Sequence, residues 1–142
     1  MRNEALEHLE VLVGEWALTL SDAWFLEPAG TEVQGSATGA WLGEAFITIR
    51  MDLDGEATCV IGRSDANDAF EVLYHDDRGV GRRFTMTWDG GHWTMLREDP
   101  DFHQRFIADV EPDRIRGHWD MSEDRGRTWK KDFDLLFERV KN

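Results

Sequence analysis

The chain has little cysteine, little positive charge and no long hydrophobic run, and each shortage excludes a class of protein. Cys59 is the only cysteine among 142 residues, so neither an intrachain disulfide nor a cysteine-based metal cluster can form. Lys and Arg number 16 against 29 Asp and Glu, and the formal net charge of −13 repels phosphate backbones and anionic lipid headgroups. We therefore expect no nucleic acid and no membrane partner. With no apolar span and no charged-then-apolar leader, a cytoplasmic protein is expected.

Large aromatic rings, by contrast, are abundant. The chain has seven Trp and eight Phe beside one Tyr, and 41% of its residues are hydrophobic, which argues against disorder. A chain of this length can form a single domain with a real core, and we predict one domain spanning residues 1–142. So many bulky rings in so short a chain favour a wide core or a lined cavity.

The pattern of apolar residues predicts one short helix followed only by strands. Leu6, Leu9 and Leu12 fall at helical spacing within residues 3–13, and Gly14 is expected to end the helix. Beyond it, apolar and polar residues alternate with the period of half-buried strands. The predicted strands cover residues 15–20, 32–41, 44–53, 57–62, 70–75, 80–88, 92–97, 102–110, 114–122 and 128–140.

Short turns join these strands in sequence order, which is the arrangement of a meander. A meander of nine or ten strands removes its unpaired edges by closing on itself. We therefore predict an all-β, up-and-down antiparallel barrel with a short N-terminal helix, and a β-sandwich is the second choice.

The last predicted hairpin contains the octet from Ser122 to Trp129, which resembles the Asp-box motif S-x-D-x-G-x-T-W at every signature position. In sialidases this motif is repeated across propeller blades and lies away from the chemistry, whereas this chain has one copy and is too short for a propeller. We interpret it as a structural turn. Gly126 can take a positive φ, and the side chains of Ser122 and Asp124 can bond backbone N–H groups.

The two ends of the chain resemble the calycin (lipocalin-like) superfamily. Gly14-Glu15-Trp16 opens the first strand and Phe137-Glu138-Arg139 closes the last. In that superfamily an Arg from the last strand packs on the Trp of the first and closes the barrel, because a guanidinium can stack on an indole and still bond carbonyls. Gly117-His118-Trp119, the Asp-box octet and Asp132-Phe133-Asp134 follow one another near the end of the chain. With them, nearly the full length resembles an uncharacterised bacterial family of calycin-like barrels, which ends in Gly-x-Trp, the Asp-box turn and Asp-x-Asp. The resemblance implies the barrel and small-ligand binding, and no activity.

Arg97 and Gln104 share the inward parity of their strands with many apolar residues. A buried Arg needs an anion or several acceptors. Either Arg97 holds the carboxylate or phosphate of a ligand, or it pairs with an acid of the chain such as Glu98 or Asp99. The predicted ligand-binding residues are Arg97, Gln104, Tyr74, Trp88, Trp93, Met95, Phe106 and Trp119.

From these residues we predict that the barrel binds a small apolar or amphipathic molecule. An anionic group on that molecule would pair with Arg97. The loop around Trp24 and Phe25 is a candidate lid. No nucleophile elbow, glycine-rich phosphate loop or dinucleotide fingerprint occurs, and the histidine spacing does not indicate a metal site. We therefore expect no catalytic residue, no metal and no cofactor.

Two alternatives remain open. One is an enzyme on the same barrel that uses Arg97 with His75 or His103. The other is a homodimer without a ligand, in which exposed Trp24, Phe25 and Trp41 form the interface.

A further expectation concerns the acids of the last strand. Asp132 and Asp134 share the outward parity of that strand, so we expect both to form ion pairs with Lys130, Arg114 or Arg116 on the barrel surface.

Overall fold

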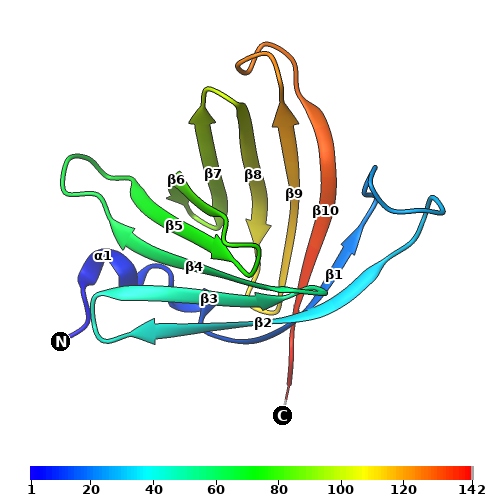
Figure 1. Cartoon of the computed structure of the whole chain (residues 1–142). Coiled ribbons are helices and arrows are strands. Elements are labelled where there is room, and N and C mark those ends of the chain that lie inside the picture. Colours follow the sequence, from blue (N-terminus) through cyan, green and yellow to red (C-terminus); the bar gives the residue numbers. More distant parts are fainter. Residues whose placement is uncertain (142) are drawn as a thin grey trace.

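The computed structural model describes residues 1–141, and in this part of the chain ten antiparallel strands close into a barrel (Figure 1). Each strand pairs with the next along the chain, and β1 pairs with β10. The predicted all-β, up-and-down barrel is confirmed. The strands are β1 (Gly14–Ser21), β2 (Val33–Leu42), β3 (Phe46–Asp52), β4 (Glu56–Arg63), β5 (Phe70–Asp76), β6 (Gly81–Asp89), β7 (His92–Asp99), β8 (Phe102–Val110), β9 (Arg114–Ser122) and β10 (Lys130–Arg139).

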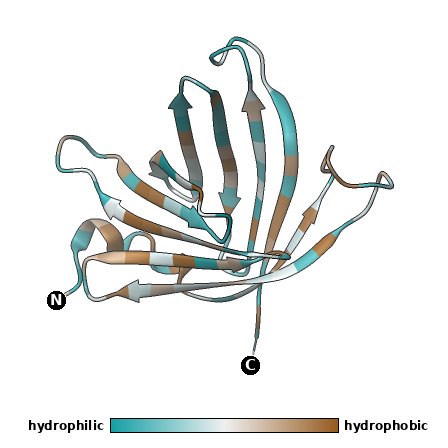
Figure 2. Ribbon diagram, in the orientation of Figure 1, coloured by the Kyte–Doolittle hydropathy of each residue, from teal (hydrophilic) through white to brown (hydrophobic). Residues whose placement is uncertain are grey.

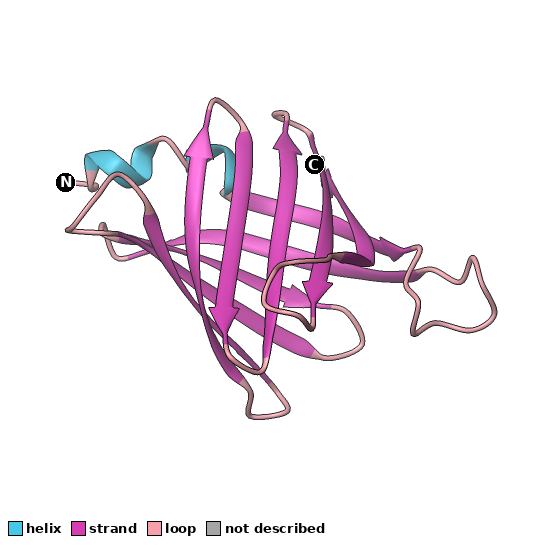
Figure 3. Cartoon of the chain, turned by 90° about the horizontal axis from the view of Figure 1, so that it is seen from above, coloured by secondary structure: helices cyan, strands magenta, loops and turns pink. Residues whose placement is uncertain are grey.

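Seen from above, the strands on the near side of the barrel cross those on the far side (Figure 3). Hydrophobic and hydrophilic bands alternate along most strands, as expected when successive side chains point into and out of the barrel (Figure 2). Within residues 1–141, no helix has the length and apolar character that a membrane crossing requires.

The prediction of a single helix over residues 3–13 is wrong. This segment forms a short helix, α1 (Glu4–Glu7), and a 3₁₀ turn, η1 (Glu10–Leu12). Its buried leucines recur every three residues, which matches a 3₁₀ turn of about 3.0 residues better than an α-helix of about 3.6. The backbone bonds agree, since the N–H of Leu9 donates to the carbonyl of Leu6 and that of Leu12 to Leu9.

These leucines close one end of the barrel. Leu6, Leu9 and Leu12 are buried in the core that the strands enclose. Gly39 of β2 allows the approach, because a Cβ at this position would collide with the Leu12 carbonyl oxygen. We call this end, where β1 begins and β10 finishes, the closed end.

Arg139 packs on Trp16 at the closed end, as predicted from the sequence of the first and last strands. The Arg139 guanidinium lies 4.2 Å from the centre of the Trp16 ring. It also donates to the carbonyl oxygens of Val13 (2.8 Å), Val11 (2.6 Å) and Pro112 (2.8 Å). This arginine therefore ties the N-terminal segment and the β8–β9 connection to the last strand.

A continuous series of aromatic contacts runs from the closed end toward the other end of the barrel. The ring centroids of successive pairs lie between 4.9 and 6.4 Å apart, and edge-on or tilted geometries predominate, as aromatic pairs prefer. The series passes through Trp16, Phe137, Trp93, Phe106, Trp119, Phe84 and Tyr74.

The turn between β9 and β10 has the hydrogen bonds that its sequence predicts. The Ser122 hydroxyl oxygen accepts from the Gly126 N–H at 2.8 Å, and Asp124 Oδ1 accepts from the Thr128 N–H at 2.8 Å. Gly126 has a φ of 83°. The bonds from Thr128 are the main reason that the pKa of Asp124 falls to about 2.

Candidate ligand-binding site

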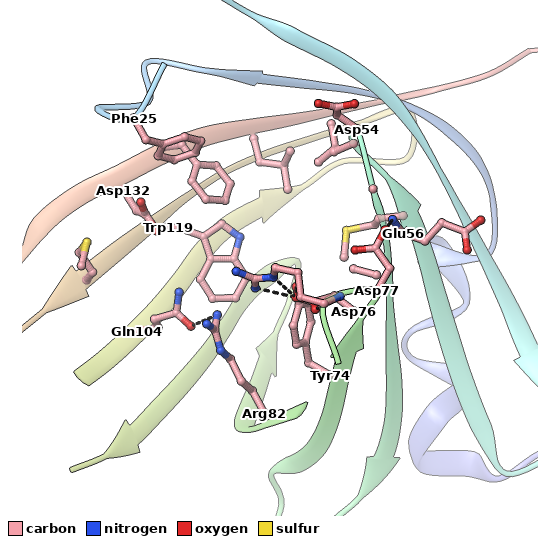
Figure 4. Close-up of a pocket in the computed structure, with 18 of the residues that line it drawn as sticks. Phe25, Asp54, Glu56, Tyr74, Asp76, Asp77, Arg82, Gln104, Trp119 and Asp132 are labelled. Carbon is pink, nitrogen blue, oxygen red and sulfur yellow. Dashed lines mark hydrogen bonds and ion pairs between the residues drawn. The ribbon is translucent and has the colours of Figure 1, made fainter. Parts of the chain in front are cut away.

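A cavity of about 630 Å³ lies at the end of the barrel away from α1 and η1, which we call the open end (Figure 4). Its walls come from the inward faces of the strands and from the turns that follow β1, β3 and β5. Aromatic rings form much of the wall, and charged groups lie around the rim. The aromatic residues that line it are Trp24, Phe25, Tyr74, Phe84, Phe102, Trp119 and Phe133.

Arg82 is the cation of this cavity that pairs with no acid of residues 1–141. Its Nη1 donates to Gln104 Oε1 at 3.0 Å, and its guanidinium lies 5.1 Å from the centre of the Phe102 ring. Within residues 1–141 it forms no ion pair, and its other N–H groups have no hydrogen-bond partner. Burial is the main cause that lowers the pKa of Arg82; the charges of Arg78 and Arg97 act in the same direction, and Tyr74 and Asp76 act in the opposite one without cancelling it.

The position of Arg82 follows from a local separation of two strands. The β6–β7 pairing ends at Thr85 and Leu96, so residues 81–84 have no partner on β7. A groove of about 490 Å³ marks this separation on the side of the barrel. Arg82 reaches past it to Gln104 on β8, and this hydrogen bond joins β6 to β8 where the sheet does not.

Asp132 also lines the cavity, which corrects the expectation that it faces outward. The β9–β10 pairing shifts between Lys131 and Phe133, and this β-bulge places Asp132 on the cavity side. Asp134 keeps the outward parity and pairs with Lys131 at 3.0 Å rather than with the basic residues we expected. A bulge puts two consecutive residues on one side of a strand, so simple alternation fails at Asp132, whereas the residues after it keep the predicted faces.

The loop between β1 and β2 reaches the cavity through its two aromatic residues. Trp24 Nε1 donates to Asp132 Oδ1 at 2.9 Å, and the Phe25 ring meets the edge of the Phe133 ring at 5.9 Å. Both remain accessible to solvent, with Trp24 63% and Phe25 47% exposed. The predicted lid loop thus lies beside the cavity and is held to β10.

A second acid of the cavity, Asp76, is fully engaged by its neighbours. Tyr74 donates its hydroxyl proton to Asp76 Oδ2 at 2.8 Å, and Arg78 donates to the same oxygen at 2.6 Å. Hydrogen bonds from Arg78 hold the pKa of Asp76 well below its usual range. Burial, together with the Asp76 carboxylate, raises the pKa of Tyr74 to about 12. Tyr74 is therefore a hydrogen-bond donor and not a general base at neutral pH.

Arg97 is buried as its parity predicted, at 9% exposed, but it does not line the cavity. Its guanidinium pairs with Asp99 at 3.0 Å and Asp101 at 3.1 Å, and it donates to the Phe102 carbonyl at 2.8 Å. The pKa of Asp101 is lowered chiefly by this arginine. Of the two interpretations of Arg97, the structure shows pairing with acids of the chain.

The other predicted ligand-binding residues lie at three levels of the barrel. Tyr74, Gln104 and Trp119 line the cavity of the open end. Below it is a small apolar cavity of about 40 Å³, lined in part by Trp93, Met95 and Phe106 and shared with Tyr74 and Trp119. Trp88 lies apart from both, in a surface pocket that also includes Ala5 and His8 near α1.

Trp93 and Cys59 are buried beside the small cavity. Trp93 Nε1 is buried and has no hydrogen-bond partner within residues 1–141. Cys59 lines the small cavity, and burial raises the pKa of its thiol to about 12. A thiol in this state behaves as a small hydrophobic group, as the sequence indicated.

The residues of the enzyme alternative do not come together, whereas Trp24 and Phe25 of the dimer alternative contact each other with ring centres 5.7 Å apart. His75 is exposed on β5, and His103 has the outward parity of β8, with its ring 6.4 Å from that of Trp129, so neither meets Arg97. Trp41 is half-buried, and its Nε1 donates to Glu10 at 2.6 Å. In the described part of the chain, no group of three His, Cys, Asp or Glu side chains is placed to hold a metal ion.

Comparison with known proteins supports the fold of this chain and does not identify a family or an activity. No protein-family model matches the sequence, and no curated protein matches it either. In structure the chain is similar to Rv2717c from M. tuberculosis, known from its crystal structure, with a TM-score of 0.71 and 12% sequence identity. The match covers 99% of this chain and 100% of that one. Both chains therefore share a β-barrel architecture over their whole length, and at this identity the likeness supports the fold alone.

Proposed function

We propose that this barrel binds a small amphipathic molecule in the cavity of its open end. The apolar part of the ligand would lie against the aromatic wall, where Trp119 and Phe84 stand, and its polar end would accept hydrogen bonds from Arg82. The observation that carries the proposal is the half-buried guanidinium of Arg82, which has one hydrogen bond and no acid partner within residues 1–141. A cation in such a position is stabilised when a ligand supplies the missing acceptors.

We also propose that the barrel belongs with the calycin-like barrels and that its β9–β10 turn is an Asp box. The stacking of Arg139 on Trp16 and the hydrogen bonds of Ser122 and Asp124 support this assignment. A cavity within the barrel is the usual binding place in barrels of this size.

Binding of anilinonaphthalene sulfonate, a dye with an aromatic body and one anionic group, tests the proposal. We expect the dye to fluoresce with the folded wild-type protein and Arg82→Met to weaken its binding about tenfold, the loss of one charged hydrogen-bonding group. Arg83→Met is the matched control, because Arg83 is the next residue on β6 and is exposed outside the barrel. Absence of dye binding to the wild type, or equal affinities of the two variants, would contradict the proposal.

Three expectations remain predictions. The protein could form a homodimer, it is expected to bind neither nucleic acid nor a membrane, and it is expected in the cytoplasm. The exposed rings of Trp24 and Phe25 are the feature that favours a dimer. Light scattering at several protein concentrations tests it, and a monomer at all of them would exclude it.

A further inference from the structure

Arg82 and Asp132 are half-buried, opposite charges that line the open-end cavity, and neither forms an ion pair within residues 1–141. Asp132 Oδ1 accepts from Trp24 Nε1, whereas Oδ2 accepts no hydrogen bond within the described residues. Arg82 and Asp132 do not form an ion pair with each other. Each is half-buried, so each lacks part of the water that would otherwise solvate it.

The pKa of Asp132 agrees with this description. Burial is the largest influence and raises the pKa, while the hydrogen bond from Trp24 and the charges of Lys130 and Arg82 act in the opposite direction without cancelling it. Asp76, in the same cavity, shows the contrast, because Arg78 binds it directly and its pKa falls.

The charge of the whole cavity disfavours a ligand that is only anionic. The lining holds five carboxylates and two guanidiniums, an excess of three negative charges. In Figure 4, Asp54, Glu56 and Asp77 lie on one side, across the cavity from Asp132. A ligand with both charges is attracted to Arg82 without carrying net negative charge into this field. The charged residues are Asp54, Glu56, Asp76, Asp77, Asp132, Arg78 and Arg82.

We propose that the ligand is a small zwitterion with an aromatic or other flat apolar body, whose anionic group binds Arg82 and whose amine binds Asp132. This inference rests on the proposed function of the cavity. Figure 4 shows the Trp119 ring between the Arg82–Gln104 pair and Asp132, so an apolar body lying on Trp119 would have one charged group of the protein on each side. The free Oδ2 of Asp132 accepts from the amine, and Gln104 holds the guanidinium toward the anionic group.

Three compounds with the same indole ring test the inference by calorimetric titration: tryptophan carries both charges, indolepropionate only the anion and tryptamine only the cation. We expect wild-type protein to bind tryptophan about tenfold more tightly than either of the others. Asp132→Asn lowers tryptophan affinity about tenfold, to that of indolepropionate, while indolepropionate itself binds no more weakly. Arg82→Met lowers tryptophan affinity to that of tryptamine.

Asp134→Asn is the matched control, because Asp134 lies two residues further along β10, outside the barrel and paired with Lys131. It should leave all three affinities unchanged. The inference is overturned if indolepropionate or tryptamine binds wild-type protein as tightly as tryptophan does, if none of the three binds, or if Asp132→Asn and Asp134→Asn behave alike. Dye binding that depends on Arg82 would in each of these cases still support the proposed function, so the two failures are distinguishable.

Discussion

An arginine lies near aromatic rings at each end of the barrel, Arg139 at the closed end and Arg82 at the open end, and the two differ in how many hydrogen bonds they make. Arg139 lies 4.2 Å from the Trp16 ring centre and donates to three main-chain carbonyls. Arg82, at the open end, lies 5.1 Å from the Phe102 ring centre and within residues 1–141 donates only to Gln104. Each nitrogen of the Arg139 guanidinium therefore donates a hydrogen bond, whereas two nitrogens of Arg82 are left for a ligand.

This difference distinguishes arginines that stabilise the fold from one that is available to bind. Arg97 belongs with Arg139, because Asp99 and Asp101 neutralise it. Burial alone did not separate them, since Arg97 is the more buried of the two inward-facing arginines at the open end. What separates them is ion pairing: two acids pair with Arg97, although its buried Nε has no hydrogen-bond partner, whereas no acid within residues 1–141 pairs with Arg82.

The largest effect is expected from the leucines that close the barrel. Leu9 is 0% exposed, so Leu9→Ala should lower the free energy of unfolding by about 3 kcal/mol through lost burial and the cavity it leaves. Urea unfolding followed by tryptophan fluorescence measures this. Leu73→Ala, on the outside of β5 and 54% exposed, is the control and should change stability by less than about 0.5 kcal/mol. Equal losses would show that α1 and η1 do not form part of the core.

Arg139→Met is expected to have the next largest effect. It leaves three carbonyl oxygens without their donor and removes the cation from Trp16, which should cost about 2 kcal/mol in urea unfolding. Dye binding by the folded protein should be unchanged, because the cavity lies at the other end. Arg114→Met removes an exposed arginine 3.7 Å from Glu138 and should have little effect on stability.

The same substitution at the open end should give the reverse result. Arg82→Met removes one hydrogen bond to Gln104 but also a half-buried charge without an acid partner, so the free energy of unfolding should change by less than about 1 kcal/mol. Dye affinity should nevertheless fall. A loss of stability as large as that of Arg139→Met would indicate that Arg82 mainly joins β6 to β8, and the contrast between the two ends would not hold.

The smallest effect concerns pH and the β9–β10 turn at the open end. The pKa of Asp124 is about 2 in the folded protein against an ordinary value of 3.8. A lowered pKa means that the ionised group contributes stability above about pH 4, and that this contribution is lost as the pH falls toward 2. Between these values the wild type should lose stability more steeply than Asp124→Asn. Parallel pH profiles of the two proteins would contradict this assignment.

Much of the fold could be predicted because strand alternation is a local property. The strands were located within a few residues, and the terminal Trp16 and Arg139 indicated the closure that the structure shows. The N-terminal segment was less predictable, because leucines spaced every three residues suit both an α-helix and a 3₁₀ turn.

The site was predicted only in part. Arg82 shares its parity with Phe84 and Met86, so alternation could have placed it inside the barrel. Its lack of an acid partner could not be foreseen, since that depends on the early end of the β6–β7 pairing. The inward position of Asp132 could not be predicted from alternation, because the apolar pattern of β10 gives no indication of the bulge that turns Asp132 inward.

The meander, the faces of most strands and the hydrogen-bonded turn after Ser122 could be predicted from the sequence, since all three depend on neighbours along the chain. Which charged groups lack an ion partner within residues 1–141 depends instead on the three-dimensional fold. Asp99 and Asp101 reach Arg97 locally, within the β7–β8 hairpin. Closure of the barrel brings carbonyl groups to Arg139 and places Arg82 and Asp132 in one cavity, where distant turns converge. Such meetings depend on register and bulges over the whole sheet, which no local pattern records.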